Sequence, residues 1–158
     1  MTVHHQRSIV VTTAGQGLTD ITAQVGRVVE AAQVELGLVT VFVKHTSASL
    51  IINENADPDV RRDLLGFFAR LVPEYDQLYT HTAEGPDDMP AHVKSALTAT
   101  SLSIPVSDGR MCLGTWQGIY LWEHRRSDHH RHVVIHVTGT SDRYSLTQSQ
   151  ANSPTGEM

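Results

Sequence analysis

Ionisable side chains concentrate in residues 79–94, a stretch with little regular pattern. The stretch contains two histidines and three acidic residues, which are His81, Glu84, Asp87, Asp88 and His92. Histidine nitrogen and carboxylate oxygen both bind zinc, and one histidine on a helix with another on the adjoining loop makes a workable ligand pair. The carboxylates could bind the metal, orient a histidine or act as a general base. Because the spacing matches no standard zinc motif such as HExxH, an acidic loop that caps a helix stays the alternative.

A second polar cluster follows an apolar run. His45 comes directly after residues 38–44, and the short side chains of residues 46–49 mostly carry hydroxyl groups. Strand ends that feed polar loops often present functional groups on a rigid scaffold, and hydroxyls and amides can donate hydrogen bonds to an anion. Residues 53–57 (NENAD) extend this polar character. A hydrogen-bonded strand end, followed by a helix with Asp57 as its N-cap, explains the same residues equally well.

The third cluster is residues 114–125, with the sequence GTWQGIYLWEHR. Glycines inside a strand-like segment indicate a bulge, or the close approach of a ligand or a neighbouring chain. His124 could supply a third metal ligand or be a structural histidine. We predict that Trp116 belongs to the core and that Cys112 is a buried side chain in a strand.

The scaffold that positions these clusters is predicted from the hydrophobic pattern. Branched and apolar runs predict strands at residues 8–13, 38–44, 49–52, 101–106, 114–123 and 132–138. Helical spacing predicts helices through residues 21–32, 58–71 and 91–98, the last opened by Pro90. Residues 74–90 are predicted to be one long loop, which in a compact domain is functional or disordered.

This order of elements predicts the fold class. The later strands follow one another by short turns such as Asp108-Gly109, which favours an α+β fold with a largely antiparallel or mixed sheet over a regular βαβ fold. We expect a single domain over residues 1–140 and a disordered polar tail over residues 141–158. Several long apolar strands need cover on both faces, which oligomerisation could supply.

Composition excludes several function classes. A chain of 158 residues with 40% hydrophobic and 18% charged residues is an ordinary globular domain, and its net charge of −5 argues against a general nucleic-acid binder. The one basic run, Arg125-Arg126 followed by Arg131, is interpreted as a solvated loop. The single cysteine allows no internal disulfide, and no apolar run is long enough for a signal peptide or a bilayer span. We therefore expect a cytoplasmic protein without a membrane partner.

The three clusters together resemble a known family. The strings HTSASL…NEN, EGPDDMPAH-K and GTWQGIYL-EHR are similar to the motifs of the YjbQ family, labelled secondary thiamine-phosphate synthase enzymes. The resemblance covers roughly residues 6–140. It implies a compact α+β fold that assembles as a homotrimer, with polar pockets near subunit boundaries.

The resemblance also implies roles for individual residues. The candidate metal ligands are His45, His81 and His92. The candidate catalytic residues are Glu84, Asp88 and Lys94. The candidate substrate-binding residues are Ser47, Glu54, Asn55, Thr115, Gln117 and His124. We predict a divalent metal ion, with zinc as the best match, and no organic cofactor, because a histidine-rich site is softer than the oxygen-rich sites that magnesium prefers.

Three functions stay open at this point. The family label implies a transferase that joins a pyrimidine diphosphate to a thiazole phosphate, either as the main reaction or as a side activity. Such a reaction needs cations around the leaving pyrophosphate, and the sequence contains no recognisable pyrophosphate-binding loop. The second function is a metal-dependent hydrolase with Glu84 or Asp88 as general base, and the third is a non-catalytic trimeric metabolite-binding protein. In each case we expect a small, phosphorylated ligand.

Overall fold

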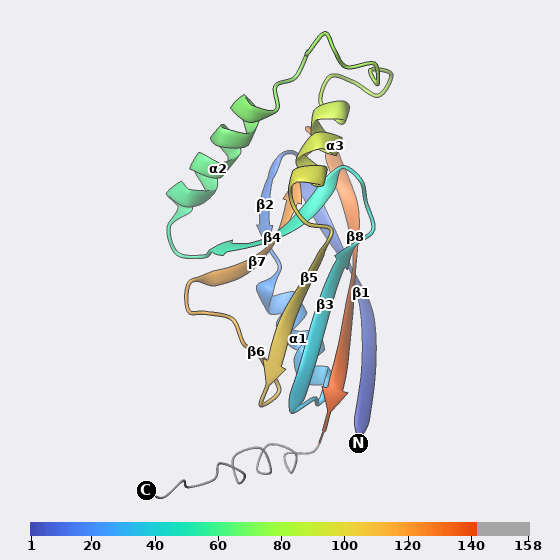
Figure 1. Cartoon of the computed structure of the whole chain (residues 1–158), viewed down its shortest axis with the longest axis vertical. Coiled ribbons are helices and arrows are strands. Elements are labelled where there is room, and N and C mark those ends of the chain that lie inside the picture. Colours follow the sequence, from blue (N-terminus) through green and yellow to red (C-terminus); the bar gives the residue numbers. More distant parts are fainter. Residues whose placement is uncertain (142–158) are drawn as a thin grey trace, which may run out of the picture.

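The computed structural model describes residues 1–141, and all but the first residue of the predicted disordered tail lies outside the described residues. The chain forms two antiparallel sheets and, within the described residues, three helices (Figure 1). This confirms the predicted α+β class. No helix in residues 1–141 is long and apolar enough to cross a membrane.

The larger sheet has five strands in the order β1-β8-β3-β5-β6. Their bounds are Thr2–Ala14 for β1, Asp128–Thr140 for β8, Leu36–Val43 for β3, Ser101–Ser107 for β5 and Arg110–Met111 for β6. The smaller sheet has the order β2-β7-β4, with bounds Gly17–Asp20, Gln117–Glu123 and Ala48–Glu54. β1 and β8 are longer than predicted because they pair over 13 residues, and β2 was not predicted at all.

The core lies between the larger sheet and helix α1 (Thr22–Ala32). Val39, Val41 and Val43 alternate along β3 and are almost fully buried, as a strand with one covered face requires. The residues between them, among which Leu38 and Phe42 are exposed, point to the opposite face. No element of residues 1–141 covers that face, which lies toward the viewer in Figure 1.

Helix α2 (Pro58–Leu71) has the predicted bounds. Asp57 caps it, because its carboxylate accepts a hydrogen bond from the Asp59 amide at 2.9 Å, and Pro58 occupies the first helical position. No α2 residue is fully buried, although Phe68 contacts Trp122 edge to face at 4.7 Å between ring centroids. The helix therefore lies on the molecule rather than inside it.

Helix α3 (Asp88–Leu97) begins two residues before Pro90, so the predicted start was wrong. A proline in the first helical turn is tolerated because its missing amide hydrogen would have no partner within the helix. As a consequence Asp88 belongs to the helix and not to the loop. The predictions for Trp116 and Cys112 were also wrong, since both side chains are exposed in the connection before β7.

Candidate metal centre

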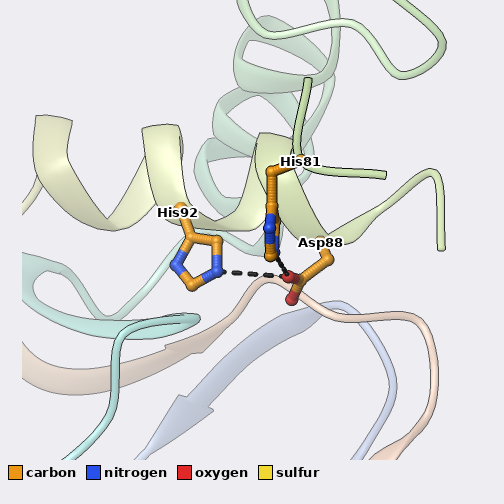
Figure 2. A group of neighbouring side chains, drawn as sticks. All are labelled: His81, Asp88 and His92. Carbon is orange, nitrogen blue, oxygen red and sulfur yellow. Dashed lines mark hydrogen bonds and ion pairs between the residues drawn. The ribbon is translucent and has the colours of Figure 1, made fainter. Parts of the chain in front are cut away.

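Three side chains converge at the N-terminal end of α3. Figure 2 shows the rings of His81 and His92 directed at the carboxylate of Asp88. Oδ2 of Asp88 lies 2.7 Å from Nε2 of His81 and 3.2 Å from Nε2 of His92. One ligand atom from each residue lies within 4.8 Å of the other two, and no other such group of three occurs in residues 1–141.

Local structure explains this convergence. Asp88 and His92 are four residues apart on α3, which places them one above the other on the same helix face. His81 comes from the preceding loop. That loop turns back at Gly85, whose φ of 105° lies in a region that side chains other than glycine rarely adopt.

Arg125 orients the carboxylates from the connection between β7 and β8. Its Nη1 donates to Oδ1 of Asp88 at 2.6 Å, and its Nε donates to Oδ2 of Asp87 at 3.0 Å. Its Nη2 also donates to the carbonyl of Glu84 at 2.9 Å. Because Arg125 occupies Oδ1 of Asp88, Oδ2 is left to face the histidines. Arg125 is half-buried and ion-paired, so its interpretation as part of a solvated loop was wrong.

The electrostatics keep Asp88 ionised. Burial by itself would raise the Asp88 pKa, but the hydrogen bond with His81 and the charge of Arg125 outweigh it, and the pKa is lowered. The same hydrogen bond raises the pKa of His81. Without a metal, the site therefore favours a carboxylate beside a protonated histidine, an arrangement in which a divalent cation could replace the proton.

The backbone sets the orientation of His92. Its Nδ1 lies 3.0 Å from the carbonyl oxygen of Thr46, which can only accept, so Nδ1 donates. In the neutral ring Nε2 then carries the lone pair and is free to bind a metal, an arrangement common among metal-ligating histidines. Two imidazole nitrogens and one carboxylate oxygen match a catalytic zinc site that keeps a fourth position open.

The structure places His45 beside this centre but not in it. Nε2 of His45 accepts a hydrogen bond from the His132 amide at 2.8 Å, and Nδ1 lies 3.3 Å from Arg131. Burial and the charge of Arg131 lower the His45 pKa. Ser47 contacts the same arginine, with its Oγ 3.0 Å from Nη2. Among residues 45–47, the hydrogen bond to the candidate centre is the one that the Thr46 carbonyl accepts from His92.

Other predicted site residues lie elsewhere. Asn55 donates to the carbonyl oxygens of Thr115 and Gln117 at 3.2 and 3.4 Å. Glu54 pairs with Gln117 in the register of β4 and β7, while Ala48 pairs with Glu123 at the other end. Six residues of strand span roughly 20 Å. Within one chain these residues therefore share no pocket with residues 45–47, and a pocket completed by another copy stays a prediction.

Lys94 and His124 line a separate cavity under α2. Nε2 of His124 lies 2.8 Å from the hydroxyl of Ser49, and burial, followed by the charge of Lys94, lowers the His124 pKa to about 3. Burial also lowers the pKa of Lys94. His124 is thus a neutral, buried histidine in this cavity and does not belong to the group formed by His81, Asp88 and His92.

The polar clusters predicted from the sequence include Thr46, Ser49 and Asp87, but no partner was predicted for them, and Arg125 was predicted to be solvated. The structure pairs Thr46 with His92, Ser49 with His124, and Arg125 with both Asp87 and Asp88. The usable signal for Arg125 was the adjacent acidic pair at residues 87 and 88, which needs a basic partner if it is buried. Because Arg125 lies 37 residues from Asp88, only the fold shows that Arg125 is this partner.

These features define an α+β protein with two antiparallel sheets and a candidate centre of two histidines and one aspartate. The chain belongs to the family described as UPF0047 protein YjbQ-like, whose model matches residues 7–140. This confirms the resemblance found in the sequence.

Individual relatives agree with this assignment. The chain is 56% identical over 135 residues to a UPF0047 protein of Synechocystis, covering 85% of this chain and 92% of that one. It is 40% identical over 136 residues to the UPF0047 protein YjbQ of Escherichia coli O157:H7, covering 85% and 98%. A YbjQ-like protein of unknown function from Sulfolobus solfataricus matches with a TM-score of 0.82 at 27% identity, covering 89% of this chain and 100% of that one.

Proposed function

We propose that this chain is a metal-dependent enzyme that binds one divalent ion, with zinc as the best match, through His81, Asp88 and His92. The observation that carries the proposal is the convergence of two histidine Nε2 atoms on one carboxylate oxygen. Arg125 and the Thr46 carbonyl occupy the remaining polar atoms of Asp88 and His92, so the three facing atoms are free to share a cation.

The neighbouring residues support chemistry at this centre. A bound ion would act as a Lewis acid or lower the pKa of a bound water. The carboxylate of Glu84 lies 3.0 Å from Nε2 of His81 and is exposed, so it can accept a proton from a group that enters from solvent. His81 is also accessible to solvent, and the centre is open to a small molecule on that side.

The reaction that the family label implies is transfer of the thiamine-phosphate synthase type, and it is the first reaction to test. Expulsion of pyrophosphate needs positive charge, which the ion would supply. Hydrolysis is the second candidate, favoured by the position of Glu84 beside His81. A non-catalytic binding protein is the third. Cytoplasmic location stays a prediction.

Assembly as a homotrimer is part of the same proposal. The open face of β3 exposes Leu36, Leu38 and Phe42, and Val10 of β1 is exposed on the same sheet. Copies of the chain that pack through this face would remove apolar surface from water. Light scattering on the purified protein should give three times the chain mass, and a monomer would contradict this part of the proposal.

Metal binding tests the centre directly. Protein stripped with a chelator should take up one equivalent of zinc, and His81→Ala should weaken the affinity at least tenfold. His130→Ala is the matched control, since His130 is exposed on β8 and contacts Thr12 instead. Full zinc affinity in His81→Ala, or no uptake by the unsubstituted chain, would contradict the proposal.

Activity separates the three functions. Zinc-loaded protein would be incubated with the pyrimidine diphosphate and the thiazole phosphate, with His92→Ala as the control. Thiamine phosphate formed above that control supports the transferase. Release of inorganic phosphate from a panel of phosphate esters, lost in Glu84→Gln, supports the hydrolase. If the protein binds zinc but converts neither set of substrates, the function that remains is that of a non-catalytic binding protein.

A further inference from the structure

A cavity of about 170 Å³ lies between α2, α3 and the end of β7. Leu65, Phe68 and Trp122 form its apolar wall, and Lys94, His124 and Gln16 contribute polar groups. Figure 1 shows α2 and α3 at the same end of the molecule, away from the core around α1. The cavity is thus separate from the hydrophobic core.

Two polar side chains in this cavity have unused hydrogen-bonding groups. Lys94 is 8% exposed, and none of the hydrogen bonds or ion pairs within residues 1–141 involves its ammonium group. His124 is 1% exposed, and its Nδ1 has no hydrogen-bond partner among the same residues. By contrast Glu123, which also lines the cavity, is ion-paired with Arg131.

Such groups are costly to bury. An ammonium group withdrawn from water loses its hydration, and the loss is offset only when a counter-charge or acceptors replace the water. Buried polar atoms without partners are rare in folded proteins, and a missing water or ion is a common explanation for them. An oxyanion would supply both the charge for Lys94 and a polar partner for His124.

The cavity is the right size for one such group. A cavity of about 150 Å³ holds a molecule as large as benzene. A phosphoryl or carboxylate group fits, whereas a whole phosphorylated heterocycle does not. A second hollow of about 350 Å³ adjoins it through Gln16, Ala69 and Lys94 and continues past Tyr75 and Arg126. The rest of a small molecule can extend into that hollow.

The cavity and the candidate metal centre lie on different sides of α3. Lys94 follows His92 by two residues, which is about 200° around the helix axis. The side chains of His81, Asp88 and His92 do not line the cavity. Ligand binding in the cavity is therefore independent of metal binding at His81, Asp88 and His92.

We propose that the cavity under α2 binds the oxyanionic group, phosphate or carboxylate, of a small organic molecule. Lys94 provides the charge, His124 provides a second polar contact, and the apolar wall packs against the part of the ligand next to the anion. The charges of Glu74 and Arg126 both act on Lys94, but these two residues are ion-paired with each other. No side chain of residues 1–141 forms an ion pair with the Lys94 ammonium group.

Calorimetric titration with inorganic phosphate at constant ionic strength tests the site. We expect saturable binding to the unsubstituted chain, and Lys94→Met should weaken it at least tenfold. Lys44→Met, which removes the exposed second lysine of the chain, should leave the affinity unchanged. Equal affinity in Lys94→Met, or no saturable binding to the unsubstituted chain, would overturn the proposal. Acetate in place of phosphate then distinguishes a carboxylate site from a phosphate site.

A second measurement does not depend on the variants folding. The chain contains two lysines, so reductive methylation with ¹³C leaves two lysine signals, for Lys44 and Lys94, beside that of the N-terminus. Phosphate should shift the Lys94 signal and leave the Lys44 signal in place. Equal small shifts of both would show a general salt effect and refute the site. His81→Ala should retain phosphate binding, and its loss there would place the anion at the metal centre instead.

Discussion

Substitution within the ion pair between Glu123 and Arg131 should lower the free energy of unfolding strongly. Glu123 is 1% exposed and Arg131 is 3% exposed. Oε1 of Glu123 accepts from Nε of Arg131 at 2.8 Å and from the hydroxyl of Thr13 at 2.6 Å. The same arginine donates to the carbonyl oxygen of Ser47 at 3.2 Å. The pair therefore joins β7 and β8 to the polar segment next to the candidate metal centre.

Glu123→Gln removes the charge and keeps the size of the side chain. Burial alone would raise the Glu123 pKa, but the hydrogen bonds from Arg131 and Thr13 outweigh it and lower the pKa, so the wild-type group is ionised. The substitution leaves Arg131 buried without a counter-charge. Breaking a buried pair in this way costs about 3–5 kcal/mol of unfolding free energy.

Urea denaturation at fixed protein concentration measures this loss. With a slope of about 2 kcal/mol per molar urea, the midpoint should fall by roughly 2 M. Asp59→Asn, which breaks the exposed pair between Asp59 and Arg62 on α2, is the control and should cost below about 1 kcal/mol. If Glu123→Gln cost no more than Asp59→Asn, the argument from burial would be refuted.

Three further predictions use the same denaturation assay. The pKa of His124, about 3, lies below that of a histidine in the unfolded chain. Neutral His124 therefore contributes fully to the free energy of unfolding above about pH 6.5. This contribution is lost as the pH falls, by up to about 1.4 kcal/mol per pH unit. His124→Gln should flatten this dependence, and an unchanged slope would contradict it. Gly139→Ala should lower the free energy of unfolding by about 1–3 kcal/mol, because the added Cβ would lie 2.3 Å from the Leu36 carbonyl oxygen. An unchanged free energy of unfolding would mean that β3 and β8 can separate at this position. Asp57→Ala should cost about 1 kcal/mol through loss of the cap on α2, and Asp57→Ser should restore most of it.

Features set by neighbouring residues could be predicted from the sequence. The bounds of α2 follow from Asp57-Pro58 and from apolar residues at helical spacing, all of which act within a few turns. The hairpin at Asp108-Gly109 follows from two residues that adopt positive φ, 51° and 73°. Branched and apolar residues likewise predicted a strand at residues 38–44, and the exposure of Leu38 and Phe42 shows that only one of its faces is covered. The grouping of two histidines with three acidic residues in residues 79–94 is local in the same sense, because these side chains come from one loop and the helix that follows it. That they form a functional site stays a prediction.

Only the tertiary structure decided which distant groups meet. The connection from β7 in the smaller sheet to β8 in the larger sheet brings Arg125 to Asp88 and buries Arg131 against Glu123. Both arginines stand in a polar segment that the sequence predicts to be solvated. The length of β7 separates Gln117 from the candidate metal centre within one chain. Such outcomes depend on strand pairing and burial across the whole chain. Hydrophobic period and local propensity carry no information about them, so the polar segment of residues 79–94 could be singled out from the sequence, whereas the partners that orient its side chains could not.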